Sequence, residues 1–237
     1  MSIWKQTIQI RNKDVNLYQK LRTSRLMEIL QEVCIAHTEA LGAGRTKTLD
    51  RGFLWVIIQQ EINIQRIPVY DETITVSSWP GDTMHVLFPR YYQITDEHEN
   101  IIIQGSSLWT LIDQNTRKMI FADRYGITVP GGKTDTDIPL PKAIAKEECD
   151  HHDIFKVPFS WCDLNGHLNN TRYFDLAEDR IQSASLNRQL TSVSAEYTSE
   201  APFKETLHIS WHEDNDHAYI SGDHEKNCFR IRMTYKD

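Results

Sequence analysis

One long amphipathic helix, set among segments that alternate like β-strands, constrains the fold of this chain more than any other feature. Residues 22–41 carry a stripe of side chains at i, i+3 and i+4 spacing, made of Leu26, Ile29, Leu30, Val33, His37 and Leu41. Gly42 and Gly44 follow directly and mark the end of the helix. A stripe of this kind faces a core, so the pattern predicts a helix packed against other elements.

Strand-like runs surround this helix. One precedes it at residues 3–10, and four follow at 52–66, 73–79, 84–95 and 101–112. Pro80-Gly81-Asp82 and the polar segment 96–100 supply turns between neighbouring runs. The sequence therefore favours an α+β architecture in which a twisted antiparallel sheet wraps one long helix.

The same order of elements then repeats. Residues 131–148 contain prolines and glycines without an amphipathic period, and we predict that they form a linker. After them come a strand at 152–160, a helix at 170–186 and strands near 191–199, 205–212, 217–223 and 227–235. A period of roughly 120 residues is too long for a solenoid. We therefore predict a duplication, with one domain at 1–130 and a second at 149–237.

The composition narrows the class of protein. Its 40% hydrophobic and 25% charged residues are ordinary for a globular chain, and no apolar run approaches the ~18 residues of a membrane span. A formal net charge of −7 argues against a nucleic-acid partner, because phosphate binding needs a concentrated basic field. The first residues lack the apolar centre of a signal peptide, so we expect a cytoplasmic protein.

Cysteine usage gives no sign of a metal or redox motif. The four cysteines, Cys34, Cys149, Cys162 and Cys228, form no C-x-x-C pair, and reduced structural thiols are expected. The string Cys149-Asp150-His151-His152 offers potential ligands, but nothing in the spacing nominates a fourth group. We therefore expect no metal and no cofactor.

The stretch WCDLNGHLNNTRYF, residues 161–174, concentrates polar groups just before the second predicted helix. Asp163, Asn165 and His167 stand at two-residue spacing, at which alternate side chains of an extended segment point the same way. Helix capping and an Asn-Gly turn explain single residues of this kind, and that structural interpretation stays open. In the functional interpretation, His167 acts as acid, base or orienting donor. Asp163 or Asn165 would fix its tautomer, and the helix amino terminus would polarise a carbonyl.

The first half carries the same helix entry without this polar set. Aligning residues 22–29 with 169–176 places Asn16, Tyr18 and Lys20 where the second half has Asp163, Asn165 and His167. If the set is catalytic, the protein has one active site, in its second half.

A hydrolytic site also needs a nucleophile or an activated water. Cys162 neighbours the motif, but its parity in an extended segment turns it away from Asp163, which favours a structural thiol. Ser160 and Ser199 lack a G-x-S-x-G elbow. A carboxylate remains, and Glu200 follows on the first strand after the second helix, although a lone strand glutamate is usually solvated.

The chain resembles the acyl-[acyl carrier protein] thioesterases of bacteria and plant plastids over almost its whole length. The likeness rests on LMEILQEVCIAHTEALG, WVIIQQEINIQRIPVYDETITVSSW and SSLWTLIDQNTRKM in the first half, and on DLNGHLNNTRYF and AEYTSEA in the second. This resemblance implies two tandem hot-dog domains, each a long helix wrapped by an antiparallel sheet. The catalytic set that it implies consists of Asp163, Asn165, His167 and Glu200.

The implied reaction is hydrolysis of the thioester of a fatty acyl-[acyl carrier protein]. Glu200 would activate a water or, on a covalent route, form an anhydride. Plant members carry a cysteine directly after this glutamate, whereas this chain has Ala201, so a thiol there is dispensable if the chain is active. A thioesterase for coenzyme A esters and a non-catalytic acyl-binding module remain as alternatives.

Further residues are candidates for contact with the substrate. The resemblance places the acyl chain in the first half, where the candidate lining residues are Met27, Leu30, Trp55, Trp79 and Trp109. Each of these is also an ordinary core residue. Asn169 and Asn170 are candidates beside the catalytic set.

The resemblance also implies an acidic carrier protein as partner, which needs a local basic patch. The candidate contacts are Arg22, Arg25, Arg45, Lys47 and Arg172, although a solvated helix face explains them as well. A homodimer is expected from the resemblance. The length of the acyl chain depends on packing and is not predicted.

Overall fold

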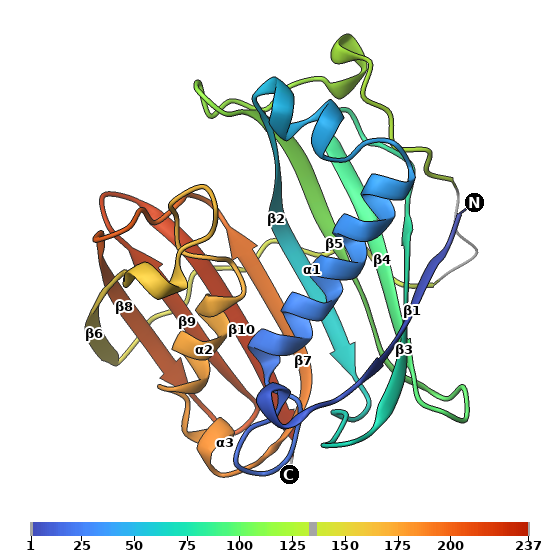
Figure 1. Cartoon of the computed structure of the whole chain (residues 1–237). Helices are drawn as coiled ribbons and strands as arrows, with labels where there is room; N and C mark the ends of the chain where they lie inside the picture. The colour runs from blue at the N-terminus through green and yellow to red at the C-terminus, as the bar shows by residue number, and fades with distance from the viewer. Residues whose placement is uncertain (1, 133–136, 237) are drawn as a thin grey trace.

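The organising element of the structure is a single ten-stranded antiparallel sheet (Figure 1). The computed structural model describes residues 2–132 and 137–236. The strands follow the order β1-β3-β4-β5-β2-β7-β10-β9-β8-β6. Helix α1 lies on one face of the first half, and the shorter α2 and α3 lie on the same face of the second half (Figure 1).

The bounds of these elements follow the predicted order of strand, helix and strands in each half. The first half contains β1 (Trp4–Gln9), α1 (Thr23–Ala40), β2 (Phe53–Ile64), β3 (Thr73–Pro80), β4 (Leu87–Thr95) and β5 (Ile101–Asp113). The second half contains β6 (His151–Lys156), α2 (Arg172–Glu178), α3 (Gln182–Ser185), β7 (Gln189–Tyr197), β8 (Thr206–Glu213), β9 (His217–Asp223) and β10 (Asn227–Lys236). Short 3-10 turns lie at Asn12–Asp14, Arg45–Lys47, Leu49–Arg51, Ala122–Tyr125 and Phe159–Trp161. None of the helices in the described ranges has the length and apolar character needed to cross a membrane.

The two halves share one topology. The order β1-β3-β4-β5-β2 recurs in reverse as β7-β10-β9-β8-β6, so β2 and β7 meet at the centre and β1 and β6 lie at the two edges. A helix follows the first strand of each half and packs on the sheet (Figure 1). The predicted α+β fold of two tandem hot-dog units is therefore confirmed.

The second helix differs from the continuous helix that we predicted at 170–186. It is broken between α2 and α3, where Ile181 takes an extended conformation with φ −88° and ψ 122° and remains buried. The carboxylate of Glu213 on β8 accepts the backbone N–H groups of Gln182 at 2.7 Å and Ser183 at 2.8 Å. A distant strand thus caps the new helix start, which the local apolar period does not reveal.

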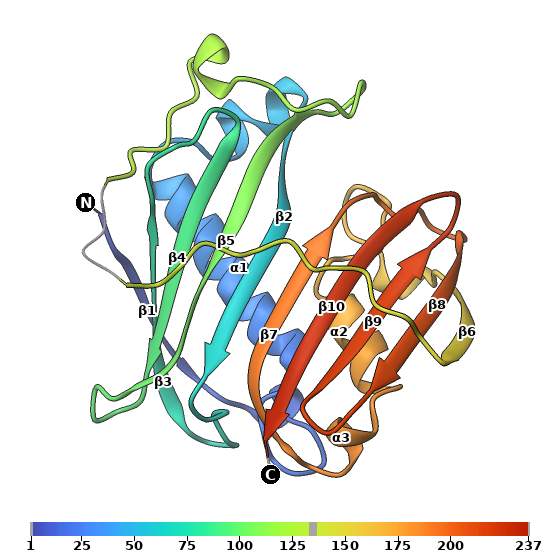
Figure 2. The same cartoon turned by 180° about the vertical axis from the view of Figure 1, so that it is seen from behind.

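The predicted linker runs across the face of the sheet that the helices leave uncovered (Figure 2). Its described part forms no helix or strand, and residues 133–136 lie outside the described residues. The hydroxyl of Ser106 donates to the carbonyl of Pro139 at 2.5 Å, and the backbone N–H of Ile144 donates to Glu196 at 3.3 Å. The linker is therefore fastened to strands of both halves.

A continuous apolar core joins the two halves. It contains buried residues from α1 and β2 as well as from α2, β7 and β10. Ile62 on β2 lies opposite Val193 on β7, and both are 0% exposed. Because this pair belongs to the core of both units, we expect the halves to unfold together.

The seam between the halves is the pairing of β2 with β7. We expect Ile62→Ala to lower the free energy of unfolding by about 2–5 kcal/mol, because it removes buried methylenes and leaves a cavity at this seam. Urea denaturation followed by circular dichroism and tryptophan fluorescence should still show one coincident transition. Ile101→Ala on β5, where the side chain is 38% exposed, is the control and should change stability little. Two separated transitions would contradict the common core.

Candidate active site

Asp163 organises the turn that carries the polar motif. Its Oδ1 accepts the backbone N–H of Asn165 at 2.8 Å and that of His167 at 3.3 Å. The backbone N–H of Asp163 donates to the carbonyl of His167 at 2.8 Å, and Gly166 adopts φ +77°, which favours glycine. The side chain of Asp163 thus holds the turn through its backbone, as in an Asx-turn.

The first half builds the same turn from other side chains. Oδ1 of Asn16 accepts the backbone N–H groups of Tyr18 at 3.0 Å and Lys20 at 3.1 Å. Gln19 takes the left-handed conformation, with φ 59°, at the position of Gly166. These matching hydrogen bonds support the alignment of the two helix entries and show that the turn itself needs neither the carboxylate nor the imidazole.

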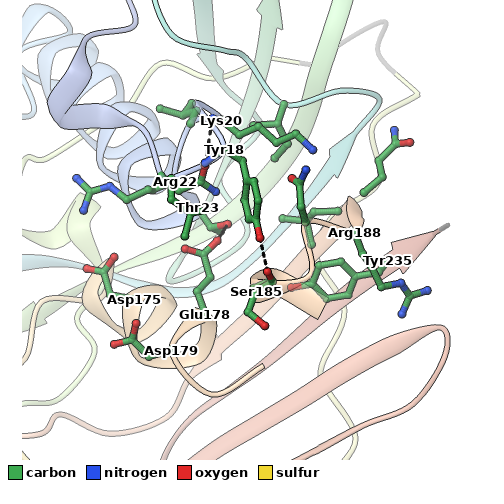
Figure 3. Close-up of a pocket in the computed structure, with 18 of the residues that line it drawn as sticks. Tyr18, Lys20, Arg22, Thr23, Asp175, Glu178, Asp179, Ser185, Arg188 and Tyr235 are labelled. Carbon is green, nitrogen blue, oxygen red and sulfur yellow. Dashed lines mark hydrogen bonds between the residues drawn. The ribbon is translucent and has the colours of Figure 1, made fainter. Parts of the chain in front are cut away.

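The turn of the first half opens onto a cavity that residues of both halves line (Figure 3). This cavity has a volume of about 820 Å³ and is lined by charged residues of both halves, among them Lys20 and Asp175. Tyr18 stands at the place of Asn165, and its hydroxyl donates to the carbonyl of Ser185 at 2.5 Å (Figure 3). The side chain of Tyr18, within the turn of the first half, therefore bridges the two halves.

The first half also lacks the carboxylate. His167 forms a β-bridge with Pro202, and Lys20 forms the equivalent bridge with Val69. This register puts Ile67 at the place of Glu200. The first-half turn therefore has neither the imidazole nor the carboxylate of its counterpart.

Glu200 lies beside His167 in the second half. Its Oε2 is 3.6 Å from Nε2 of His167. The β-bridge from His167 and the hydrogen bond from the N–H of Leu168 to the carbonyl of Ala201, at 2.8 Å, hold the two segments together. The side chains of His167 and Glu200 are 22% and 38% exposed, so a small molecule can reach both. The structure thus brings the four predicted catalytic residues into one place.

Arg117 of the first half completes this group, and the sequence analysis did not single it out. Its Nε donates to Oε2 of Glu200 at 2.9 Å, and its Nη2 pairs with Oε1, so the guanidinium holds both oxygens. Arg117 lies on the hairpin after β5, which extends towards the second half (Figure 1). Its segment belonged to the family pattern, but no spacing in the sequence shows that it crosses to the other half.

The hairpin that presents Arg117 is tightly constrained. Oδ1 of Asp113 accepts the backbone N–H groups of Asn115 at 3.1 Å and Thr116 at 2.7 Å. Arg117 itself has φ 56°, a conformation that costs free energy in a residue with a side chain. Strain of this kind concentrates at functional sites, where the surroundings enforce it.

His167 is neutral at pH 7. Burial, and after it the charge of Arg117, lower the pKa of His167 below its ordinary value of 6.5, while the carboxylate of Asp163 raises it. Nδ1 of His167 is buried without a hydrogen-bond partner among the described residues. Neither Asp163 nor Asn165 therefore fixes the tautomer of His167, which corrects the expectation from the sequence.

An apolar pocket of about 210 Å³ adjoins the turn. Leu164 and Asn165 of the turn line it together with residues of the first half. The apolar first-half lining comes from α1 and from strands β2, β4 and β5, and includes Cys34, Ile35, Phe53, Leu54, Trp55, Phe88 and Trp109. An alkyl chain attached at the turn would therefore be enclosed by the first half.

Two of the five predicted acyl-chain residues, Trp55 and Trp109, line this pocket. Met27 and Leu30 are instead buried in the core that both halves share, and Trp79 is buried without belonging to the lining. Met27, Leu30 and Trp79 are therefore core residues in this structure, which is the alternative that the sequence left open.

Asn169 and Asn170 serve the start of α2. Oδ1 of Asn169 accepts both the backbone N–H and the hydroxyl of Thr171 at 2.9 Å, and its carbonyl accepts the N–H of Arg172 at 2.9 Å. The carbonyl of Asn170 accepts the hydroxyl of Tyr197 at 3.2 Å. The N–H groups of Arg172 and Phe174 already donate to the carbonyls of Asn169 and Thr171, so these two amides at the start of α2 are not free to polarise a carbonyl.

The predicted basic residues fall into two groups at opposite ends of α1, whose 18 residues span roughly 27 Å. Arg22 and Arg25 lie at its start, and Arg25 and Arg172 both pair with Glu28 there. Arg45 and Lys47 lie beyond its last turn, and Arg45 lines the pocket beside the catalytic turn. The second group is therefore the one that adjoins the candidate active site.

Cys162 is a structural thiol in this site. Its Sγ donates to the carbonyl of Pro158 at 3.4 Å. Burial, and next the carboxylate of Asp163, raise the pKa of Cys162, which keeps it protonated. A protonated thiol is a poor nucleophile, so Cys162 is poorly suited to attack a substrate.

Comparisons with known proteins agree with this architecture. The family model of the acyl-ACP thioesterase N-terminal domain matches residues 2–122, and that of the C-terminal domain matches residues 144–232. The chloroplastic acyl-[acyl-carrier-protein] hydrolase FATB3 of Cuphea viscosissima is 28% identical over 218 residues, which cover 83% of this chain and 52% of that protein. The chain thus spans about half the length of the curated relatives that it matches.

Solved structures share the fold over the whole chain. The 12:0-ACP thioesterase from Umbellularia californica superposes with a TM-score of 0.82 at 19% identity, covering 99% of this chain and 97% of that one. An acyl-ACP thioesterase from Bacteroides thetaiotaomicron superposes with a TM-score of 0.79 at 18% identity, covering 99% and 98%. Since both domain models match in order over most of its length, this chain belongs to the acyl-ACP thioesterase family.

Proposed function

We propose that this protein hydrolyses the thioester of a fatty acyl-[acyl carrier protein] and releases the free fatty acid. The observation that carries the proposal is a carboxylate, Glu200, 3.6 Å from the neutral imidazole of His167, on the turn whose Asn165 lines an apolar pocket. Such a pair can activate a water, and such a pocket can enclose an alkyl chain. Membership of the family supports both the reaction and the carrier.

In the proposed mechanism, Glu200 takes a proton from water as the water oxygen attacks the thioester carbon. The side-chain amide of Asn165, whose hydrogen bond to Asp163 is long at 3.4 Å, would turn to donate to the developing oxyanion. The intermediate collapses with cleavage of the carbon–sulfur bond. The proton on Glu200 passes through His167 to the departing thiolate, which restores both residues.

Arg117 would act as a positioning residue in this reaction. Its two contacts with Glu200 fix the plane of the carboxylate and favour its ionised form. Its charge also favours the neutral form of His167. The first half would therefore contribute both the acyl pocket and Arg117, which orients the general base Glu200.

The remaining expectations stay predictions. Arg45 lines the pocket and Lys47 lies on the same short turn, and these are the basic residues that we propose for contact with an acidic carrier. We further expect a cytoplasmic homodimer that needs neither a cofactor nor a nucleic-acid partner.

We expect Glu200→Gln and His167→Ala each to lower kcat at least about 100-fold, because each removes a group that moves a proton. Hydrolysis of C8 to C18 acyl chains, loaded on carrier protein and on coenzyme A, measures this effect and the carrier preference. Lys20→Ala, at the equivalent place in the first-half turn, is the matched control and should keep kcat within about twofold. Wild-type protein with an intact fold that turns over neither thioester would contradict the proposed function.

Arg117→Gln should shift the pH profile as well as the rate. Removing the cation raises the pKa of His167, so the acid limb of kcat/KM, where the imidazole becomes protonated, should move to higher pH. Loss of the two hydrogen bonds that orient Glu200 should lower kcat roughly 10- to 100-fold, as for other orienting partners. Arg117→Lys keeps the charge and should keep the limb near its original pH. An unmoved limb in Arg117→Gln would show that Arg117 does not act on His167.

Asp163→Asn tests whether this carboxylate shapes the turn or takes part in the chemistry. Because Asn16 makes the same two hydrogen bonds in the first half, the substituted turn should stay intact and kcat should fall less than about tenfold. Asp163→Ala removes the acceptor and should lower the free energy of unfolding by about 1–3 kcal/mol. Inactivation of Asp163→Asn as complete as that of Glu200→Gln would instead assign a chemical role to the negative charge.

A further inference from the structure

Arg90 is a buried cation in the wall of the apolar pocket. It lies on β4 opposite Ser107 of β5, is 4% exposed, and belongs to the lining that also includes Trp55 and Asn165. A guanidinium keeps its charge at any physiological pH. A full positive charge is therefore fixed beside the space that the alkyl chain is proposed to occupy.

The partners of Arg90 do not neutralise this charge. Its Nη1 donates to Nδ1 of His37 at 2.9 Å, and its Nη2 donates to Oγ1 of Thr38 at 2.8 Å. Burial, and next the charge of Arg90, lower the pKa of His37 to about 4, so the imidazole is neutral. Across residues 2–132 and 137–236, no carboxylate forms an ion pair with Arg90.

A purely structural role does not account for the charge. Buried arginines are rare unless a carboxylate compensates them, because desolvation of the ion is costly. Arg45, which lines the same pocket, follows the ordinary pattern, since it is exposed and pairs with Asp50 at 3.0 Å. The link from β4 to His37 and Thr38 on α1 could be made by a neutral amide without burying a charge.

The position of Arg90 sets it apart from the reacting groups. Its partner in register, Ser107, precedes Asp113, the last residue of β5, by six positions, which is roughly 20 Å along a strand. The hairpin that presents Arg117 to Glu200 follows Asp113. Arg90 therefore lies towards the end of the pocket that is remote from the thioester.

We propose that this remote end of the pocket binds an oxygen-bearing chain terminus, so that the protein favours acyl chains ending in a carboxylate or hydroxyl over plain alkyl chains of equal length. The N–H groups of Arg90 that His37 and Thr38 do not accept would donate to this oxygen in a charge-assisted hydrogen bond. The inference rests on the proposed function in one respect, which is that the thioester lies at Glu200 and Asn165.

Binding is measured first, in the Glu200→Gln background, by isothermal titration with matched C8 to C16 series of alkanoic, ω-hydroxyalkanoic and α,ω-dicarboxylic acids. At the best length, the dicarboxylic acid should bind at least about tenfold more tightly than the plain acid, with the hydroxy acid between them. Adding Arg90→Gln should abolish or invert this order, and Arg90→Lys should restore part of it. Arg45→Gln, the control at the same pocket, should keep it.

Turnover then separates this proposal from the proposed function. Wild-type protein should show a higher kcat/KM for ω-hydroxyacyl than for plain acyl chains on the same carrier. Equal binding and equal turnover of plain and oxygenated chains would overturn the role of Arg90 while leaving thioester hydrolysis intact. The binding order without hydrolysis of any thioester would support the oxygen-binding pocket and contradict the proposed reaction. The relative affinities of the three acid series are measured in protein that retains Arg90. The proposal can therefore still be tested if the Arg90→Gln variant does not fold.

Discussion

The antiparallel pairing of β2 with β7 is the constraint on which the rest of the site depends. Gln59 lies opposite Glu196 in this antiparallel pairing, so the chain that leaves β7 towards Glu200 continues in the direction of the start of β2. The end of β5 is paired with that same start of β2, through Asp113 and Phe53. The hairpin of one half and the carboxylate of the other therefore emerge at the same end of the sheet. A slip in register across the seam would separate Arg117 from Glu200 and the turn from its pocket, because each residue of slip moves a strand by roughly 3.4 Å.

Duplication separates what the fold requires from what the chemistry requires. The turns around Asn16 and Asp163 share their backbone hydrogen bonds, so the backbone path is a property of the hot-dog unit and not of catalysis. The side chains on that path then determine the use of each copy. In the first half Tyr18 spans the seam to Ser185, and in the second Asn165 faces an apolar pocket. One copy thus reinforces the contact between the halves, and the other is free to bind a substrate.

The limits of sequence reasoning are visible in particular residues. The period of α1 was sufficient to predict the long helix, because that signal is local, whereas the tandem hot-dog fold was implied by the resemblance. The spacing of Asp163, Asn165 and His167 predicted an extended segment, but the structure shows a turn held by Oδ1 of Asp163. The break before α3 was not predictable, since the carboxylate of Glu213 that caps it comes from another strand. Arg117 was missed for the same reason, because only the pairing of the two halves brings it to Glu200. Met27 and Trp79 show the converse limit, since an apolar residue on the right face can belong to the core rather than to the pocket.

Arg117, which holds Glu200, and Arg90, in the wall of the pocket, are two arginines whose charges have different consequences. Arg117 is paired with the carboxylate of Glu200, which fixes the direction of that carboxylate, and the charge of Arg117 also lowers the pKa of His167. Among the residues that the structure describes, Arg90 has only neutral hydrogen-bond partners, and Glu39, which lines the same pocket, accepts the backbone N–H of Arg45 instead of pairing with Arg90. The charge of Arg90 therefore has no ion-pair partner in the described part of the chain, and its field acts on the cavity. In a low-dielectric space such a field is strong, and it favours an anion or a hydrogen-bond acceptor over a methyl group. The folded protein is stabilised elsewhere by enough apolar burial to tolerate this cost, and a ligand that supplied the missing oxygen would recover part of it on binding.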